Sequence, residues 1–311
     1  MDKRGLASLH VQRRFRPDMV LASIEKRGGE ILSSARKACA VILLAWFLLV
    51  PEGMAASVSD QPVANPETIH QRLKAKNPGY NGQAQFATQP EIGLVGDLSG
   101  TGITDLLPLK GVPFGGLDLR GLQVSNLEPL RGMPLKLLGL EEAKVVDLKP
   151  LAGMKIEKLY LSNTAVSSLM SLAGMPLQEL MLVGTKVQDL GPLKGASLQA
   201  LWLNGAPVTD ISPLAGCPLI SLTLQGTKVS DLGPLSGMVT LKRLHIGQTP
   251  VSDLTPLQNL KLTRLIFTPS KIKKGMDVAR SMKTLTEIGA TLETKMTPTQ
   301  FWALYDQGKM R

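Results

Sequence analysis

Aromatic residues and cysteines are scarce in this chain of 311 residues. Phe, Tyr and Trp make up 4% of the chain against 43% for all hydrophobic residues, so the apolar side chains are mostly aliphatic. An ordinary globular core uses more aromatic bulk, and this composition favours a thin core built in regular layers. Only Cys39 and Cys217 are present, and Cys39 lies inside an apolar run near the start. A mature exported chain therefore has no internal disulfide, and packing must stabilise it.

Patterns for catalysis and metal binding are also missing. The three histidines, His10, His70 and His245, are far apart in the sequence, and no Ser/His or Cys/His pair is indicated. The chain has no glycine-rich phosphate loop and no zinc-ligand spacing. We therefore predict a protein that is not an enzyme and has no catalytic residues, cofactor or metal.

The net charge of +10 is concentrated at the two ends of the chain. Residues 1–37 carry a net charge of +5, residues 38–241 carry −2, and residues 242–311 carry +7. A nucleic-acid groove needs Lys and Arg gathered along one face, usually with stacking aromatic side chains. A nearly neutral body between two basic ends does not have this pattern, so we expect no nucleic-acid partner.

Residues 1–56 have the layout of a leader for export. A basic pair, Arg36 and Lys37, precedes thirteen apolar residues at 38–50. A proline and small residues follow, as in a cleavable signal peptide. A membrane-spanning helix needs about 20 apolar residues, so this run is short for a permanent anchor. We predict a signal peptide and export to the periplasm, the cell envelope or the medium. The alternative is a membrane anchor formed by residues 38–50.

A short motif returns every 21 residues through most of the remaining chain. Its Pro-Leu dipeptide begins at Pro108, Pro129, Pro150, Pro192, Pro213, Pro234 and Pro256, with Ser171 filling the gap and the last spacing being 22. An L-x-L triplet lies upstream of most of them, and its alternating leucines predict a short strand with both leucines on one side. One unit cannot bury its own apolar face, so the period predicts a solenoid of stacked repeats.

Most turns before Pro-Leu carry an aspartate. The series comprises Asp105, Asp147, Asp189, Asp210, Asp231 and Asp253. Stacking could bring these carboxylates about 5 Å apart, which would suit calcium. Each aspartate, however, has its own turn to cap by accepting backbone N–H bonds. We predict turn caps rather than metal ligands. The repeat at 165–174 lacks both Asp and Pro, so we expect a local weak point there.

The unit "LxxLxLxxTxVxDLxPLxGMP" resembles the short, internalin-like leucine-rich repeats of bacteria, over about eight to nine repeats at 94–270. The resemblance implies an α/β solenoid, a horseshoe with a parallel β-sheet on the concave face, turns or 3₁₀ helices on the convex face, and helical caps. It also implies a protein partner on the concave face. Many such repeats carry an asparagine ladder, whereas this chain has Thr, Ala or Ser there, as at Thr164 and Ala206. We therefore expect looser bonding between repeats.

The flanking segments, 57–93 and 271–311, are expected to cap the array. The first has a short helical pattern, an "NPGYNG" turn and a strand at "QAQF". The second has a basic amphipathic helix at 270–285 and a last helix, with Thr297 as its N-cap and Gly308 as its stop. Both flanks are similar to those of bacterial leucine-rich-repeat proteins, some of which carry a kinase domain. Kinase motifs are missing from this sequence, so no kinase activity is implied.

The residue between the paired leucines of each repeat should face away from the core and join a column on the inner face. Aromatic, Met and Arg side chains ringed by amides are typical of a protein-binding hot spot. The predicted partner-binding residues are Tyr160, Met181, Trp202, Asn204, Gln225, Arg243 and His245. The alternative is that Trp202 lies flat on its neighbours and shields the sheet.

The sequence therefore predicts an exported, monomeric, non-enzymatic module that binds a protein or peptide on the concave face. The alternative is a membrane-anchored envelope scaffold or an accessory protein related to kinase-associated repeat proteins. A hidden hydrolase is a third class, but it would need a clustered nucleophile and base, which the sequence lacks.

Overall fold

The structure is a computed structural model that describes residues 65–310 of the chain. The predicted leader at 1–56, with its apolar run, His10 and Cys39, lies outside the described residues. Between residues 65 and 310, no helix combines the length and the apolar character that crossing a bilayer requires.

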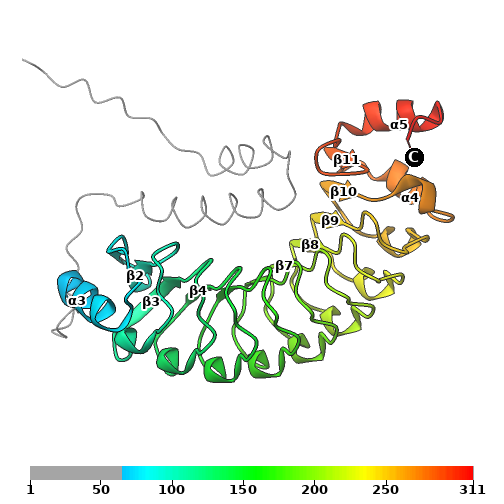
Figure 1. The fold of residues 1–311 in the computed structure, drawn as a ribbon. Helices are drawn as coiled ribbons and strands as arrows, with labels where there is room; N and C mark the ends of the chain where they lie inside the picture. The colour runs from blue at the N-terminus through cyan, green and yellow to red at the C-terminus, as the bar shows by residue number, and fades with distance from the viewer. Residues whose placement is uncertain (1–64, 311) are drawn as a thin grey trace, which may run out of the picture. The chain divides into compact units, whose positions relative to one another are not determined.

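Eleven strands form one sheet and follow one another in chain order (Figure 1). The first, β1 (Gln85–Gln89), pairs antiparallel with β2, and all later neighbours pair parallel. The parallel strands are β2 (Gly93–Asp97), β3 (Phe114–Asp118), β4 (Leu137–Gly139), β5 (Lys158–Tyr160), β6 (Glu179–Met181), β7 (Ala200–Trp202), β8 (Ser221–Thr223), β9 (Arg243–His245), β10 (Arg264–Ile266) and β11 (Glu287–Gly289). The predicted solenoid with a parallel sheet is confirmed.

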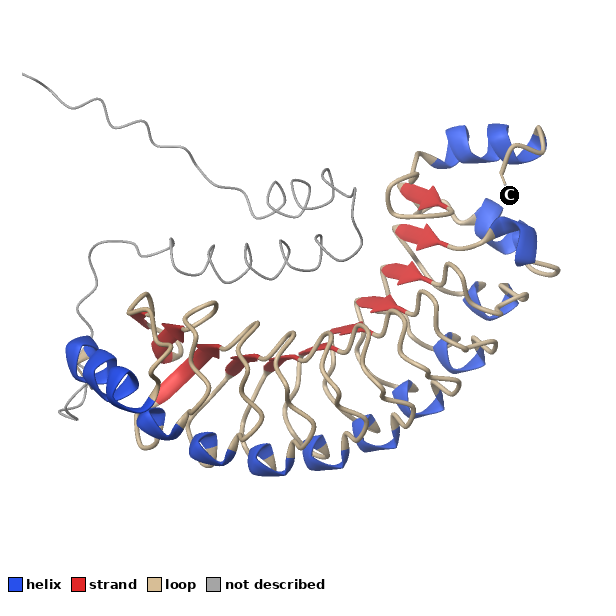
Figure 2. Ribbon diagram, in the orientation of Figure 1, coloured by secondary structure: helices blue, strands red, loops and turns tan. Residues whose placement is uncertain are grey.

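Short 3₁₀ turns cover the side of the repeats opposite the sheet. In residues 65–310 the strands line the inner side of the curve and the turns its outer side (Figure 2). The turns are η1 (Leu107–Leu109), η2 (Glu128–Leu130), η3 (Lys149–Leu151), η4 (Met170–Leu172), η5 (Gly191–Leu193), η6 (Ser212–Leu214), η7 (Gly233–Leu235), η8 (Thr255–Leu257) and η9 (Pro269–Lys271). All but η4 begin at or next to a proline, which presets the backbone φ for a tight turn.

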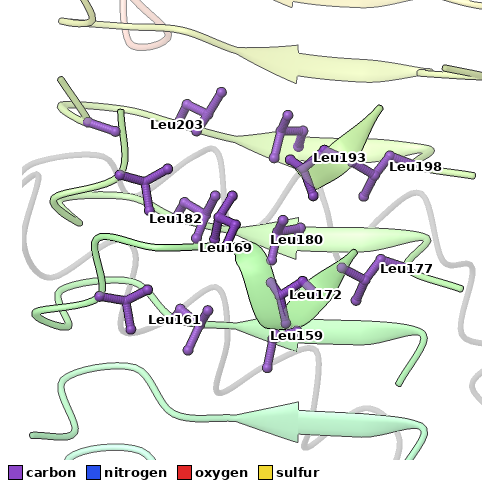
Figure 3. Close-up of a cluster of buried hydrophobic side chains, with 14 of the residues drawn as sticks. Leu159, Leu161, Leu169, Leu172, Leu177, Leu180, Leu182, Leu193, Leu198 and Leu203 are labelled. Carbon is purple, nitrogen blue, oxygen red and sulfur yellow. The ribbon is translucent and has the colours of Figure 1, made fainter. Parts of the chain in front are cut away.

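The hydrophobic core lies between the sheet and these turns. Leu159, Leu180 and Leu201 are directly paired strand neighbours, and all three are fully buried. Figure 3 shows leucines of successive repeats aligned in rows, including Leu161, Leu182 and Leu203. Cys217 joins this core as a buried free thiol.

The aspartates cap the turns, as predicted. Each accepts the backbone N–H of the second residue after it, over 2.7–2.9 Å. In the repeat without Asp and Pro, Ser168 Oγ accepts the N–H of Met170 over 3.4 Å, which is a longer and weaker bond. The turn η4 still forms, but its cap is the poorest of the series.

The threonines that replace the asparagine ladder bond within their own repeat. The hydroxyl of Thr164 donates to Leu161 O over 2.7 Å, and Thr185 and Thr227 do the same in their repeats. Backbone groups connect the repeats instead, and Gly184 N–H donates to Asn204 O over 2.8 Å. These threonine hydroxyls add no bond between repeats, and the looser bonding relative to an asparagine ladder stays a prediction.

The segment before the array, residues 66–77, packs against the first repeat and hydrogen-bonds to it. Helix α3 (Pro66–Lys76) contributes Ile69 and Leu73 to the core. The buried Asn77, at the end of α3, accepts the N–H of Asp105 over 2.8 Å and donates to Asp105 O over 3.0 Å. One side chain therefore joins the helix to the loop of the first repeat.

The helix predicted at 270–285 is much shorter in the structure, so the predicted length was wrong. Helix α4 (Met276–Ser281) has only six residues, and Gly275 before it has φ of 79°. A Cβ on Gly275 would lie 2.5 Å from the backbone nitrogen of Thr255, so this close approach requires glycine. Residues before Gly275 follow the preceding repeat, with Lys274 O accepting the N–H of Leu254.

The last helix has the predicted ends. Helix α5 (Pro298–Asp306) begins with a capping box between Thr297 and Gln300, and Gly308 follows it with φ of 69°. The buried Phe301 packs against Phe267, with ring centroids 5.7 Å apart. This contact extends the core beyond the last strand.

The weak turn η4 should be stabilised by Ser171→Pro. Proline occupies the matching position in η1, η2, η3 and η5–η8, and no bond of the Ser171 N–H is seen. We expect a gain of about 0.4–1 kcal/mol, because proline restricts the unfolded chain. Urea unfolding measures it. As a control, Met170→Pro should destabilise the protein by removing the N–H that Ser168 accepts. Equal effects of the two prolines would contradict this account.

Candidate functional site

The inner face of the sheet carries a straight central column of side chains, because the strands pair without an offset. Each member is the direct strand neighbour of the next. The column consists of Asp97, Asp118, Gly139, Tyr160, Met181, Trp202, Thr223, His245, Ile266 and Gly289. Its chemistry changes along the array, from acidic, through aromatic and thioether groups, to a histidine.

Trp202 occupies the middle of this column and is half-buried. Its indole is outside the hydrophobic core, whereas Leu201 and Leu203 on either side are fully buried within it. This alternation places Trp202 on the inner face, as the sequence predicts.

Several of the predicted partner-binding side chains are more buried than those of a fully exposed hot spot. Tyr160, Met181 and His245 are only 1%, 8% and 4% exposed. Strands about 4.8 Å apart keep each side chain in contact with its neighbours. Among the predicted partner-binding residues, the half-exposed ones are Trp202, Asn204, Gln225 and Arg243.

Tyr160 is fixed by a polar network at the inner face. Its hydroxyl donates to Glu179 Oε2 over 3.0 Å. Lys158 Nζ lies 2.8 Å from the other carboxylate oxygen of Glu179. A carboxylate shared between a phenol and an ammonium group holds both rotamers, so the network gives the aromatic ring a defined position.

A row of side-chain amides runs beside Trp202. Asn204 donates from Nδ2 to Gln225 Oε1 over 3.2 Å, and the hydroxyl of Thr223 donates to Asn204 Oδ1. Gln225 continues the row by donating to Gln248 Oε1 over 3.4 Å. The sequence prediction included Asn204 and Gln225 but missed Thr223 and Gln248. Gln248 has φ of 58°, and nothing in its local sequence indicates that left-handed conformation.

His245 is buried and neutral near pH 7. Neither ring nitrogen has a hydrogen-bond partner. Burial lowers the pKa of His245 from 6.5 to about 4; nearby Glu293 opposes this shift and Arg264 adds to it. His245 therefore carries no positive charge that could orient a partner at neutral pH, while its neighbour Arg243 does.

The two ends of the inner face differ in charge. At one end, Arg120 forms a bidentate ion pair with Asp118, with two contacts of 2.9 Å from Nε. Burial raises the pKa of Asp118, the Arg120 bonds oppose this, and Asp97 adds to it. At the other end, Glu287 pairs with Arg264 and with Lys295, the latter over 3.1 Å. This pairing leaves an excess of positive charge beside Arg243.

Groups suited to catalysis or metal binding do not gather on this face. Among residues 65–310, no three His, Cys, Asp or Glu side chains lie close enough together to hold a metal ion. Burial raises the pKa of the Cys217 thiol, which disfavours the reactive thiolate. His70 hydrogen-bonds to the hydroxyl of Tyr80 over 2.5 Å at the start of the array.

Comparison with solved structures identifies the class of fold. Internalin C2 of Listeria monocytogenes matches with a TM-score of 0.54 at 25% identity, over 69% of this chain and 100% of that one. A second internalin of that species, InlF, has a TM-score of 0.47 at 22% identity, over 67% and 76%. A leucine-rich-repeat protein of Leptospira interrogans has a TM-score of 0.46 at 21% identity, over 59% and 50%.

Scans against models of known protein families and against curated proteins found no match. The likeness to internalin C2, together with the parallel sheet and its 3₁₀ turns, defines an internalin-like leucine-rich-repeat protein of the bacterial type. The predicted similarity of the flanks to kinase-associated proteins stays a prediction.

The buried His245 should make the protein less stable in mild acid. Because folding lowers its pKa to about 4, the unfolded chain takes up the proton first as the pH falls below 6.5. Stability is therefore lost through this window, by about 2.5 kcal/mol at pH 4.5. His245→Leu, which has similar volume and no proton, should remove that part of the pH dependence. Urea unfolding at pH 7 and pH 4.5 measures it, and equal losses in both proteins would contradict the assignment.

Proposed function

We propose that the inner face over β5–β9 binds a protein or peptide partner, with Trp202 as the central anchor. The observation that carries this proposal is the position of the Trp202 indole, half-exposed and outside the core in the middle of an ordered sheet. Large aromatic side chains held on a rigid surface are the commonest anchors of protein interfaces.

The surroundings of Trp202 support a polypeptide as the partner. The amide row of Asn204, Gln225 and Gln248 offers donors and acceptors that match a peptide backbone. Arg243, two strands from Trp202, adds a cation at the edge of the patch. Tyr160 and Met181 are buried beside Trp202 on the other side and support its position, and His245 supports the wall as a neutral, buried ring.

The same observations favour a binding module over an enzyme. His245 has no hydrogen-bond partner, Cys217 is buried in the core, and His70 bonds to a tyrosine instead of a nucleophile. A hydrolase needs a nucleophile and a base within hydrogen-bond reach of each other. We propose a monomeric, non-enzymatic protein that uses no cofactor or metal and has no nucleic-acid partner.

Export is part of the proposal and depends on the apolar run at 38–50. Its length, and the basic residues Arg36 and Lys37 that precede it, are those of a signal peptide. Mass spectrometry of the native protein should find an N-terminus near residue 57. An intact N-terminus, with the protein in the membrane fraction, would favour the alternative of an anchored envelope scaffold.

Trp202→Ala should weaken partner capture at least tenfold while changing the melting temperature little, because the indole lies outside the core. The measurement is affinity capture with the full chain as bait, followed by titration of the recovered protein. Met170→Ala is the matched control, since Met170 is 68% exposed on the outer turn η4. Its capture should equal that of the wild type. If Trp202→Ala captures the partner as well as the wild type does, Trp202 is not the anchor and the proposal is contradicted.

A further inference from the structure

Arg243 carries a positive charge that no described residue neutralises. It lies half-buried on β9, and between residues 65 and 310 no carboxylate forms an ion pair with its guanidinium. Its direct strand neighbours are Ser221 on β8 and Arg264 on β10. Adjacent strands lie about 4.8 Å apart, and like charges side by side on a sheet repel each other. A negative charge added beside the two neighbouring arginines would reduce this repulsion.

The carboxylates at this end of the array are engaged or distant. Glu287 on β11 pairs with Arg264 through Oε2 and with Lys295 through Oε1, the latter over 3.1 Å. It lies two strands from Arg243, because β10 intervenes. Glu293 is exposed on the loop after β11, and within the described part of the chain it forms no ion pair. The charge of Arg243 is therefore available to a partner on the inner face.

The segment around Arg243 is strongly basic. Residues 242–311 hold 12 Lys and Arg against 5 Asp and Glu, a net charge of +7, whereas residues 38–241 carry −2. Three of the five acids already form ion pairs with basic residues of the same segment: Asp253, Glu287 and Asp306. A partner that approaches β9 and β10 therefore meets a positive potential, which favours an acidic surface.

We infer that the partner of the inner face presents an acidic segment, with Asp or Glu side chains, to Arg243. A guanidinium can donate two parallel N–H bonds to one carboxylate, and the neighbouring Arg264 adds to the attraction. The inference rests on the proposed function and adds the chemistry of the partner and the place where its acidic part meets the sheet.

The distance from Trp202 indicates where the acidic residue lies in the partner. Arg243 is two strands away from Trp202 and two residues before His245, which shares the column of Trp202. With strands about 4.8 Å apart and a rise of about 3.3 Å per residue, the two positions are roughly 12 Å apart. An extended peptide covers this distance in about three or four residues. An acidic residue at that spacing from the residue on Trp202 can therefore reach Arg243.

The test uses labelled nona-glutamate as the acidic probe and nona-glutamine as its uncharged counterpart, with the full chain and fluorescence anisotropy at physiological salt. The net charge of +10 attracts any polyanion, so variants are needed to locate the site. We expect the wild type to bind nona-glutamate at least tenfold more tightly than nona-glutamine. Arg243→Gln should lose at least fivefold in affinity for nona-glutamate. The matched control, Lys261→Gln, removes the same charge from an exposed position between η8 and β10 and should lose less than twofold.

Two further measurements separate binding from folding. Arg243→Lys keeps the charge and should lose less than threefold in affinity for nona-glutamate. Arg243→Gln should melt at no lower temperature than the wild type, because it removes one of two neighbouring like charges. A melting temperature several degrees lower would contradict the description of Arg243 as a charge without a partner.

Equal losses in Arg243→Gln and Lys261→Gln would overturn the inference, because net charge alone would then explain the binding. Tighter, Arg243-dependent binding of a nine-nucleotide oligodeoxythymidylate would also overturn it, since the surface would then favour phosphate over a polypeptide carboxylate. The proposed function is tested separately, by partner capture. If Trp202→Ala loses capture while Arg243→Gln binds nona-glutamate normally, the proposed function stands and the inference fails. If Trp202→Ala captures normally while Arg243→Gln loses the probe, the acidic site stands and Trp202 is not the anchor.

Discussion

The structure of the array depends on parallel strands that stack in register from β3 onward. The first leucine of each L-x-L triplet pairs directly with that of the next repeat, as Leu159, Leu180 and Leu201 do. Because every repeat from Pro108 to Pro234 has the same length, a side chain at one position always meets its counterpart in the next repeat. A single added or deleted residue within a strand would turn its leucines to the wrong face. This alignment makes both the core and the inner wall.

Alignment also explains how a chain with few aromatic residues presents an ordered inner surface. The core uses aliphatic leucines, and much of the aromatic bulk is placed elsewhere, at the ends and on the inner face. Tyr160 and Trp202 stand in one column with Met181 between them. Side chains on a sheet held by neighbouring repeats lose little further freedom on binding, which favours affinity. The acidic end at Asp118 and the cationic Arg243 give that surface a direction.

The sequence predicted what depends on period and local turn chemistry. The solenoid, the aspartate caps and the α5 capping box all follow from spacing and side-chain type. The helix at 270–285 was misjudged, because the need for glycine at 275 comes from its contact with another repeat. Burial of His245 was not predicted, since it depends on what neighbouring strands place around the ring.

The central claim is that the inner face around Trp202 contacts the partner. The chain has three tryptophans, so phenylalanine at Trp46 and Trp302 leaves Trp202 as the only indole. Acrylamide quenching of its fluorescence, with and without the captured partner, tests the claim most directly. The account predicts a blue shift and at least a twofold drop in quenching when the partner binds. Unchanged emission and quenching in the saturated complex would contradict it.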